Sequence, residues 1–177
     1  MAKLHYAVHK EKAFFPWLVD FISSAPVLVM VFEADGVIQG VRDALGATFV
    51  QKASPDSLRG KYGIWAGINI AHASDAPETA KDEIKLWTTE GGLKESAAAE
   101  DAAKAYIQKY LTGDADYTMA IRDVVKNAIE NRDISDNVLN SLKDLFAKDA
   151  SGIDRSDTDT LAKVVFDFVI EEVEKVE

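Results

Sequence analysis

The chain has 177 residues, of which 47% are hydrophobic and 28% are charged, a composition typical of a folded protein rather than a disordered one. It contains no cysteine, which excludes disulfide bonds and thiolate chemistry. No apolar run reaches the roughly 18 residues that span a bilayer, and the N-terminal residues lack the pattern of a signal peptide. We therefore expect a cytoplasmic protein without a membrane partner.

The formal net charge of −10 is unevenly distributed along the chain. Residues 94–177 carry 11 Lys and Arg against 19 Asp and Glu, a balance of −8 that leaves only −2 for residues 1–93. An acidic surface repels nucleic acid and anionic lipid, so we expect neither as a partner of the C-terminal part. A nucleotide could still bind where arginine and lysine side chains converge.

The first half of the chain combines helical and strand-like patterns. Apolar spacing predicts a short amphipathic helix over residues 13–24, and the run VLVMVFE predicts a buried strand over 26–33. A second helix is expected at 37–45, because Gly46 is well placed to end it. Residues 47–68 show neither periodicity, which indicates a long ordered loop of the kind that often carries function.

A short strand and a helix are expected after this loop. INIAH, residues 68–72, has the composition of a short strand. Ser74 or Asp75 is suited to cap a helix that runs to about Trp87, and Pro77 is tolerated in its first turn.

After Gly91-Gly92 the pattern becomes wholly helical. Apolar residues recur every three or four positions in four stretches: 95–111, 116–131, 135–148 and 157–176. Short links, one of them at Gly113-Asp114, favour an antiparallel helical bundle. We therefore divide the chain into residues 1–93 and an acidic helical bundle over 94–177.

Three segments of the first part carry a recognisable order of motifs. They are HYAVHKEKAFFPWLVDFISSAPVLVMVFE, then VRDALGAT followed by SPDSLRGKYGI, then NIAHASDAPETAKDEIKLW. Through residues 5–93 this order resembles the nucleoside diphosphate kinases, and the third segment resembles their N-x-x-H-x-S-D-S signature. Taken alone, His72 would be interpreted as a structural hydrogen-bonding residue, but the surrounding motif favours a catalytic one.

The resemblance implies a role for each matching residue. His72 would be the nucleophile that accepts a phosphoryl group from a nucleoside triphosphate and passes it to a diphosphate, and Glu83 would orient its ring. The remaining matches would bind the nucleotide: Tyr6 near the transferred phosphate, Phe14 on the base with Leu18 beside it, Arg42, Thr48 and Arg59 on phosphates, and Asn69 on the sugar. Mg²⁺ would accompany the nucleotide, and no metal site made by the protein alone is expected.

Several alternatives stay open at this stage. Phe14 is equally compatible with a place in the core, and His5 and His9 are expected to be solvated. The acidic residues Asp154, Asp157 and Asp159 lack the spacing and glycine of a calcium-binding loop, so helix capping is favoured.

The resemblance implies a partial ferredoxin-like kinase segment, and the helical patterns predict a four-helix antiparallel bundle after it. The expected fold class is therefore α+β and predominantly helical overall. The family begins with a strand, a helix and a second strand, including a lysine in a K-P-D sequence, that have no counterpart here. Two functions follow. One is phosphoryl transfer between nucleotides by a homo-oligomer. The other is a catalytically impaired, recombined or engineered binding or assembly protein whose helical tail mediates oligomerisation.

Overall fold

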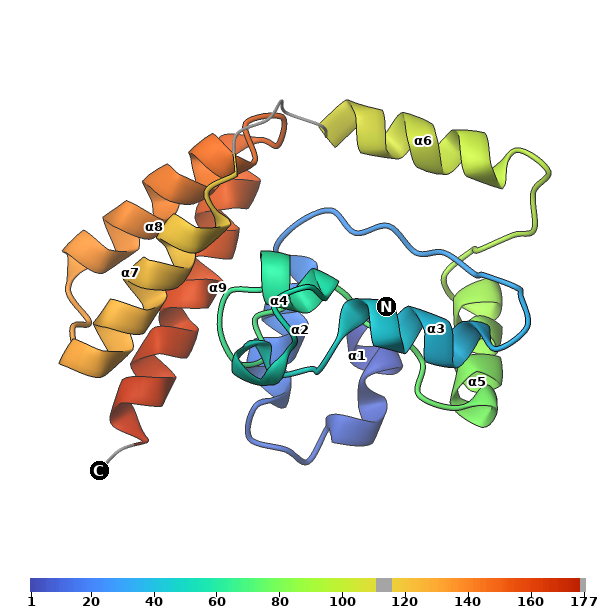
Figure 1. The fold of residues 1–177 in the computed structure, drawn as a ribbon, viewed down its shortest axis with the longest axis horizontal. Coiled ribbons are helices and arrows are strands. Elements are labelled where there is room, and N and C mark those ends of the chain that lie inside the picture. The colour runs from blue at the N-terminus through green and yellow to red at the C-terminus, as the bar shows by residue number, and fades with distance from the viewer. Residues whose placement is uncertain (111–115, 176–177) are drawn as a thin grey trace. The chain divides into compact units, whose positions relative to one another are not determined.

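The computed structural model describes residues 1–110 and 116–175, and its ordered elements are helices (Figure 1). This confirms that the chain is predominantly helical. The residues pack into two compact units, one made of Met1–Phe15 with Val27–Ala103, the other of Pro16–Pro26 with Lys104–Glu177. The boundary predicted at residue 93 follows the change in sequence character and stays a prediction, whereas these units follow packing.

The first unit is built from short helices. They are α1 (Ala2–His5), the 3-10 helix η1 (Ala7–His9), α3 (Val37–Leu45), the 3-10 helix η2 (Val50–Lys52), α4 (Leu58–Tyr62) and α5 (Pro77–Thr89). Helix α1 packs against α5, while α4 packs against η2 and α3. The packing of α1 on α5 brings the N-terminal residues to the helix that follows His72.

The two longer helices of this unit follow the sequence closely. Helix α3 ends at Leu45, as predicted, because Gly46 adopts a φ of 78° and its N–H donates to the carbonyl oxygen of Arg42. Pro77 opens α5, where its missing N–H costs nothing. The predicted cap is wrong, since Ala76 occupies that position without a side-chain hydrogen bond and Ser74 bonds elsewhere.

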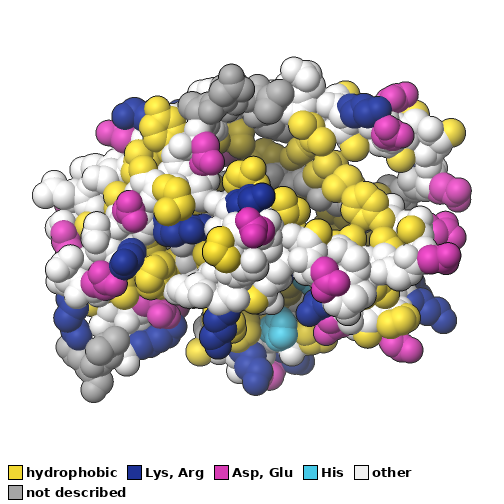
Figure 2. Space-filling model, in the orientation of Figure 1, with side chains coloured by type: hydrophobic (Ala, Val, Ile, Leu, Met, Phe, Trp, Pro, Cys, Tyr) yellow, Lys and Arg dark blue, Asp and Glu magenta, His cyan; other side chains and the backbone are white. Residues whose placement is uncertain are grey.

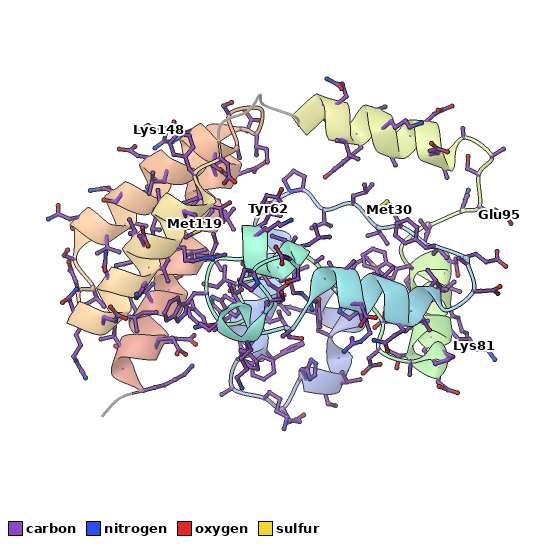
Figure 3. The ribbon with its side chains drawn as sticks, in the orientation of Figure 1. Met30, Tyr62, Lys81, Glu95, Met119 and Lys148 are labelled. Atoms are coloured by element: carbon purple, nitrogen blue, oxygen red, sulfur yellow. The ribbon has the colours of Figure 1, made fainter. Side chains whose placement is uncertain are left out.

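The two predicted strands are absent from the described residues. Residues 26–33 are extended but pair with no neighbour, and residues 68–72 contribute only an isolated bridge between Trp65 and Ile68. A β-branched, apolar run fits a sheet, but a strand also needs a hydrogen-bonded partner, and none lies alongside it in the described chain. The side chains of Val27, Met30, Val31 and Phe32 are about half exposed as a result (Figure 3, Met30).

The long loop predicted over residues 47–68 contains η2 and α4. Ser57 caps α4, because its hydroxyl oxygen accepts a hydrogen bond from the N–H of Gly60 at 3.2 Å. Helices this short give little periodicity, which explains why the sequence pattern did not reveal them.

The second unit is a helical bundle. Helices α7 (Thr118–Asn131), α8 (Asp136–Asp149) and α9 (Arg155–Glu174) pack against one another, as Figure 1 shows. Their buried side chains recur at the predicted spacing: Ile121, Val125 and Ala128 on α7, Val138, Leu142 and Phe146 on α8, and Ala162, Val165, Phe168, Val169 and Val173 on α9. The apolar periodicity of these three predicted helices is therefore confirmed.

Helix α2 (Phe15–Ser23), which was not expected in the bundle, belongs from Pro16 onward to the same unit as α7, α8 and α9. The Trp17 indole N–H donates to the carbonyl oxygen of Val164 at 2.9 Å. The Trp17 ring also lies 5.1 Å from that of Phe168, between centroids. The predicted member α6 (Ala99–Tyr110) is shared between the two units. The predicted helix ends at 111 and 176 and the break at Gly113-Asp114 lie outside the described residues.

No helix in the described part of the chain is both long and apolar enough to cross a membrane.

We predict that Trp17→Ala destabilises the second unit, because it removes both the bond to Val164 and the ring contact with Phe168. The free energy of unfolding should fall by about 2–3 kcal/mol, below the range for a fully buried tryptophan because Trp17 is half-buried. Faster native-state hydrogen exchange of the α9 amides would report the loss. Met119→Ala is the control, because that side chain on α7 is 56% exposed (Figure 3). Its removal should leave the hydrogen exchange of the α9 amides unchanged. Equal effects of the two variants on this exchange would contradict the prediction.

Candidate active site

His72, which precedes α5, faces Glu83 in the middle of that helix. The His72 Nε2 atom lies 3.0 Å from Oε1 and 3.1 Å from Oε2 of Glu83, while 39% of the His72 side chain stays exposed. The Ser74 hydroxyl donates to Oε2 of the same carboxylate at 2.5 Å. An ionised carboxylate only accepts hydrogen bonds, so in the neutral His72 ring the proton lies on Nε2 and the lone pair on Nδ1. The arrangement therefore presents one defined nitrogen for nucleophilic attack.

His5 lies beside the His72 ring and near the same Glu83 carboxylate oxygen. Its side chain is only 9% exposed, so the expectation that it is solvated is wrong. The Trp87 indole N–H donates to His5 Nδ1 at 3.1 Å, and His5 Nε2 lies 4.0 Å from Glu83 Oε1. Burial lowers the pKa of His5, the nearby His72 lowers it further, and the Glu83 carboxylate opposes both.

His5, His72 and Glu83 offer ligand atoms within 4.8 Å of one another, so a bound cation has to be considered. A metal needs an unprotonated nitrogen from each imidazole. The Trp87 N–H donates a hydrogen bond to His5 Nδ1, which places the proton of the neutral His5 ring on Nε2, and the Glu83 carboxylate places the His72 proton on Nε2 as well. The described geometry thus fits a hydrogen-bonded proton network better than a metal centre.

A row of aromatic side chains extends from His72. The Tyr6 ring lies 5.7 Å from that of His72, His9 is stacked on Tyr6 at 6.4 Å, and Phe14 lies 5.6 Å from His9. Phe14 is 44% exposed, which argues against a place in the core. The row therefore leads from the candidate nucleophile to an exposed aromatic face.

Tyr6 keeps its proton over the whole physiological range. Burial raises the pKa of Tyr6 to about 12, the Glu83 carboxylate adds to the increase, and the Arg59 charge opposes it. A neutral phenol is a hydrogen-bond donor, so Tyr6 can bind an anionic oxygen beside His72.

Arg59 connects two parts of the backbone around the site. Its side chain is buried, and its two terminal nitrogens donate to the carbonyl oxygens of Gly46 at 2.8 Å and Ala71 at 2.7 Å. The Nε atom is buried without a partner. Burial lowers the pKa of Arg59, and the charge of Arg42 lowers it further. Arg59 thus holds the backbone directly before His72, in addition to supplying positive charge.

The other predicted nucleotide-binding residues are placed as follows. Arg42 is exposed on α3. A hydrogen bond from the Thr79 side chain is the main cause that lowers the pKa of Asp75, and the charge of Arg42 lowers it further. The Asn69 side-chain N–H donates to the Thr48 carbonyl oxygen at 3.0 Å, which ties the two ends of the long loop together.

Leu18 differs from the other predicted residues, because it lies on α2 in the second unit. The first unit therefore brings together His72, Glu83 and Tyr6, with Phe14 at the end of the aromatic row, and places Arg59 close enough for its charge to act on Tyr6.

Sequence reasoning missed three members of this site: His5, Ser74 and Trp87. Ser74 stands inside the H-x-S-D motif, so its bond to Glu83 could have been suspected. His5 and Trp87 are 82 positions apart, and no local pattern indicates that they meet.

We predict that Arg59→Met weakens the first unit. The methionine keeps much of the side chain's length but leaves the buried carbonyl oxygens of Gly46 and Ala71 without their donor, which should cost about 2–3 kcal/mol of unfolding free energy. Urea unfolding followed by circular dichroism measures the loss. Arg42→Met is the matched control, and it should unfold at the wild-type midpoint because Arg42 is exposed. A wild-type midpoint for both variants would contradict this structural role.

Comparison with known proteins places the sequence of the first half of the chain in a family. The family model described as nucleoside diphosphate kinase matches residues 1–92. The nucleoside diphosphate kinase of Trichormus variabilis is 52% identical over 93 residues, covering 52% of this chain and 62% of that protein, and the enzyme of Microcystis aeruginosa is 50% identical over the same shares. That of Crocosphaera subtropica is 47% identical over 107 residues, 60% of this chain and 70% of its own. The chain thus spans less than two thirds of the first relatives' length, and by its first 92 residues it belongs to the nucleoside diphosphate kinase family.

Proposed function

We propose that this chain transfers the terminal phosphoryl group of a nucleoside triphosphate to a nucleoside diphosphate through a phosphohistidine at His72. The observation that supports this most is the contact of Glu83 with His72 Nε2 at 3.0 Å. Because that contact assigns the proton to Nε2, it leaves the Nδ1 lone pair for attack on phosphorus.

In the first half-reaction, Nδ1 of His72 forms a bond to the γ-phosphorus while the bond to the bridging oxygen breaks. The nucleoside diphosphate leaves with that electron pair. The ring becomes cationic as the N–P bond forms, and the adjacent Glu83 carboxylate stabilises this charge. In the second half-reaction, a terminal oxygen of another nucleoside diphosphate attacks phosphorus, and the N–P electron pair returns to Nδ1.

The substrate is a polyphosphate that carries its own Mg²⁺. Phosphoryl transfer depends mainly on charge neutralisation and in-line positioning. Arg42 and Arg59 would supply positive charge, and the neutral Tyr6 phenol would donate to an oxygen beside His72. Thr48 would add a phosphate contact and Asn69 a sugar contact.

The aromatic row supports a place for the base at Phe14. An exposed ring accepts the face of any nucleobase, because stacking is tolerant of base identity. The proposal therefore includes weak discrimination among nucleosides.

Incubation with ATP labelled on its γ-phosphate tests the proposal. Wild type should take up acid-labile label and His72→Ala should take up none, whereas Lys81→Gln, an exposed change on α5 outside the proposed site, should be labelled like wild type. Glu83→Gln keeps the shape but loses the charge that stabilises the ring, so its labelling rate should fall by roughly ten- to a hundredfold. Folded wild-type protein that stays unlabelled at saturating Mg²⁺-ATP would reject phosphoryl transfer.

The exposed apolar segment Val27–Phe32 favours a second candidate, assembly with a second copy of the chain. Figure 2 shows hydrophobic side chains at the surface where Figure 1 draws this extended segment. Its backbone N–H and C=O groups pair with no strand among the described residues, so a copy of the segment could pair with them.

We expect Val31→Lys to lower the mass measured by analytical ultracentrifugation from that of an oligomer towards that of one chain, because a buried charge opposes strand pairing. Val8→Lys serves as the control, since Val8 is exposed on η1 away from this segment in sequence. A wild-type mass equal to one chain at all concentrations would exclude assembly through this segment.

A further inference from the structure

The hydrogen bond from Trp87 to His5 determines where the His5 proton lies. An indole nitrogen is a donor only, so His5 Nδ1 must accept and the neutral ring carries its hydrogen on Nε2. The bond joins α5 to the end of α1 at 3.1 Å, and the His5 side chain is only 9% exposed. Both partners therefore lie on helices, α1 and α5, that pack against each other.

The Nε2–H of His5 faces the Glu83 carboxylate. Its distance to Oε1 is 4.0 Å, longer than a hydrogen bond but close enough for a favourable electrostatic interaction. The His5 and His72 rings meet edge to face with centroids 4.6 Å apart. The carboxylate thus lies among three groups: the Ser74 hydroxyl, His72 Nε2 and His5 Nε2.

We propose that Trp87 and His5 form a positioning pair, in which the indole N–H keeps His5 in the Nε2–H form and that N–H holds the Glu83 carboxylate against His72. The inference rests on the proposed phosphoryl transfer, and it assigns a role to two residues outside the predicted site.

The positioning depends on a neutral His5. A doubly protonated His5 would be a cation beside Glu83 and would compete with His72 for the carboxylate. Double protonation would also place an N–H of His5 against the N–H of Trp87, so the indole opposes it. A neutral ring can orient the carboxylate without drawing it away from His72.

The surroundings of His5 favour this neutral form. The titratable groups that face it are His72 from the segment before α5, Glu83 from α5 and Tyr6 beside it in sequence. Burial is the main cause that lowers the pKa of His5, and His72 acts in the same direction against the opposing effect of Glu83. Replacing Trp87 by phenylalanine removes the donor at Nδ1, which should raise the pKa of His5.

Four variants test the pair in the full-length chain. His5→Phe keeps a ring but loses the N–H, whereas His5→Gln returns an amide N–H near the position of Nε2. Trp87→Phe keeps a ring but loses the indole donor. Trp65→Phe is the matched control, because Trp65 lies in the turn before Ile68 and has no ring contact or side-chain hydrogen bond with His5 or His72.

Two measurements are made on each variant. Imidazole ¹H–¹⁵N correlation spectra give the tautomers of His5 and His72 and the pKa of His5. The rate of phosphohistidine formation is measured with Mg²⁺ and ATP labelled on its γ-phosphate, from about two pH units below neutrality to about two units above it.

We expect Trp87→Phe to raise the pKa of His5 and to move the acid limb of the phosphorylation profile to higher pH. His5→Phe should slow phosphorylation about tenfold at every pH, with a smaller share of His72 in the Nε2–H form, and His5→Gln should restore most of the rate. Trp65→Phe should match wild type in both measurements.

Unchanged rates and unchanged His72 tautomers in His5→Phe and Trp87→Phe would overturn the positioning role. Failure of the proposed function looks different, because wild type itself would then form no phosphohistidine. The spectra would still decide the inference in that case, since His5→Phe must alter the His72 tautomer if His5 orients Glu83, and a wild-type spectrum would reject it.

Discussion

The contact between the Glu83 carboxylate and His72 Nε2 is the interaction on which the rest of the site depends. An imidazole has two nitrogens, and only a group that binds one of them decides which is the nucleophile. Ser74 holds the other side of the carboxylate, so Glu83 cannot turn away from the ring without breaking a second bond. The packing of α1 on α5 adds His5 and Trp87 to the same assembly.

Side-chain bonds to the backbone support the segments around this site. Arg59 joins Gly46 to Ala71, the side-chain amide of Asn69 bonds to Thr48, and the Gln51 side chain accepts from the N–H of Ala66. Each bond connects segments that are far apart within residues 46–71. A buried arginine carries several donors, so one residue satisfies two backbone carbonyl groups. Arg59 therefore has a structural role that is separate from any contact with phosphate.

The sequence predicted what depends on local patterns and on the family motif. Helix α3 with Gly46 at its end, Pro77 at the start of α5 and the core spacing of Leu142 on α8 follow from turn chemistry and periodicity. The strand over residues 26–33 was wrong, because its composition reports a preference for a sheet but not the presence of a neighbour. The burial of His5 could not be predicted, since it depends on Trp87 at the far end of the segment.

Helix α2 shows that family membership and packing divide this chain differently. The family match runs through residues 1–92 and includes α2, yet from Pro16 to Pro26 these residues pack with the C-terminal helices through Trp17. The chain leaves the first unit directly after Phe15, next to Phe14 at the end of the aromatic row, and returns at Val27, where the exposed apolar segment begins. Within the second unit, the Trp17 side chain attaches α2 to Val164 and Phe168 of α9. The family segment therefore supplies a helix to a bundle whose other helices, α7, α8 and α9, lie outside the family match.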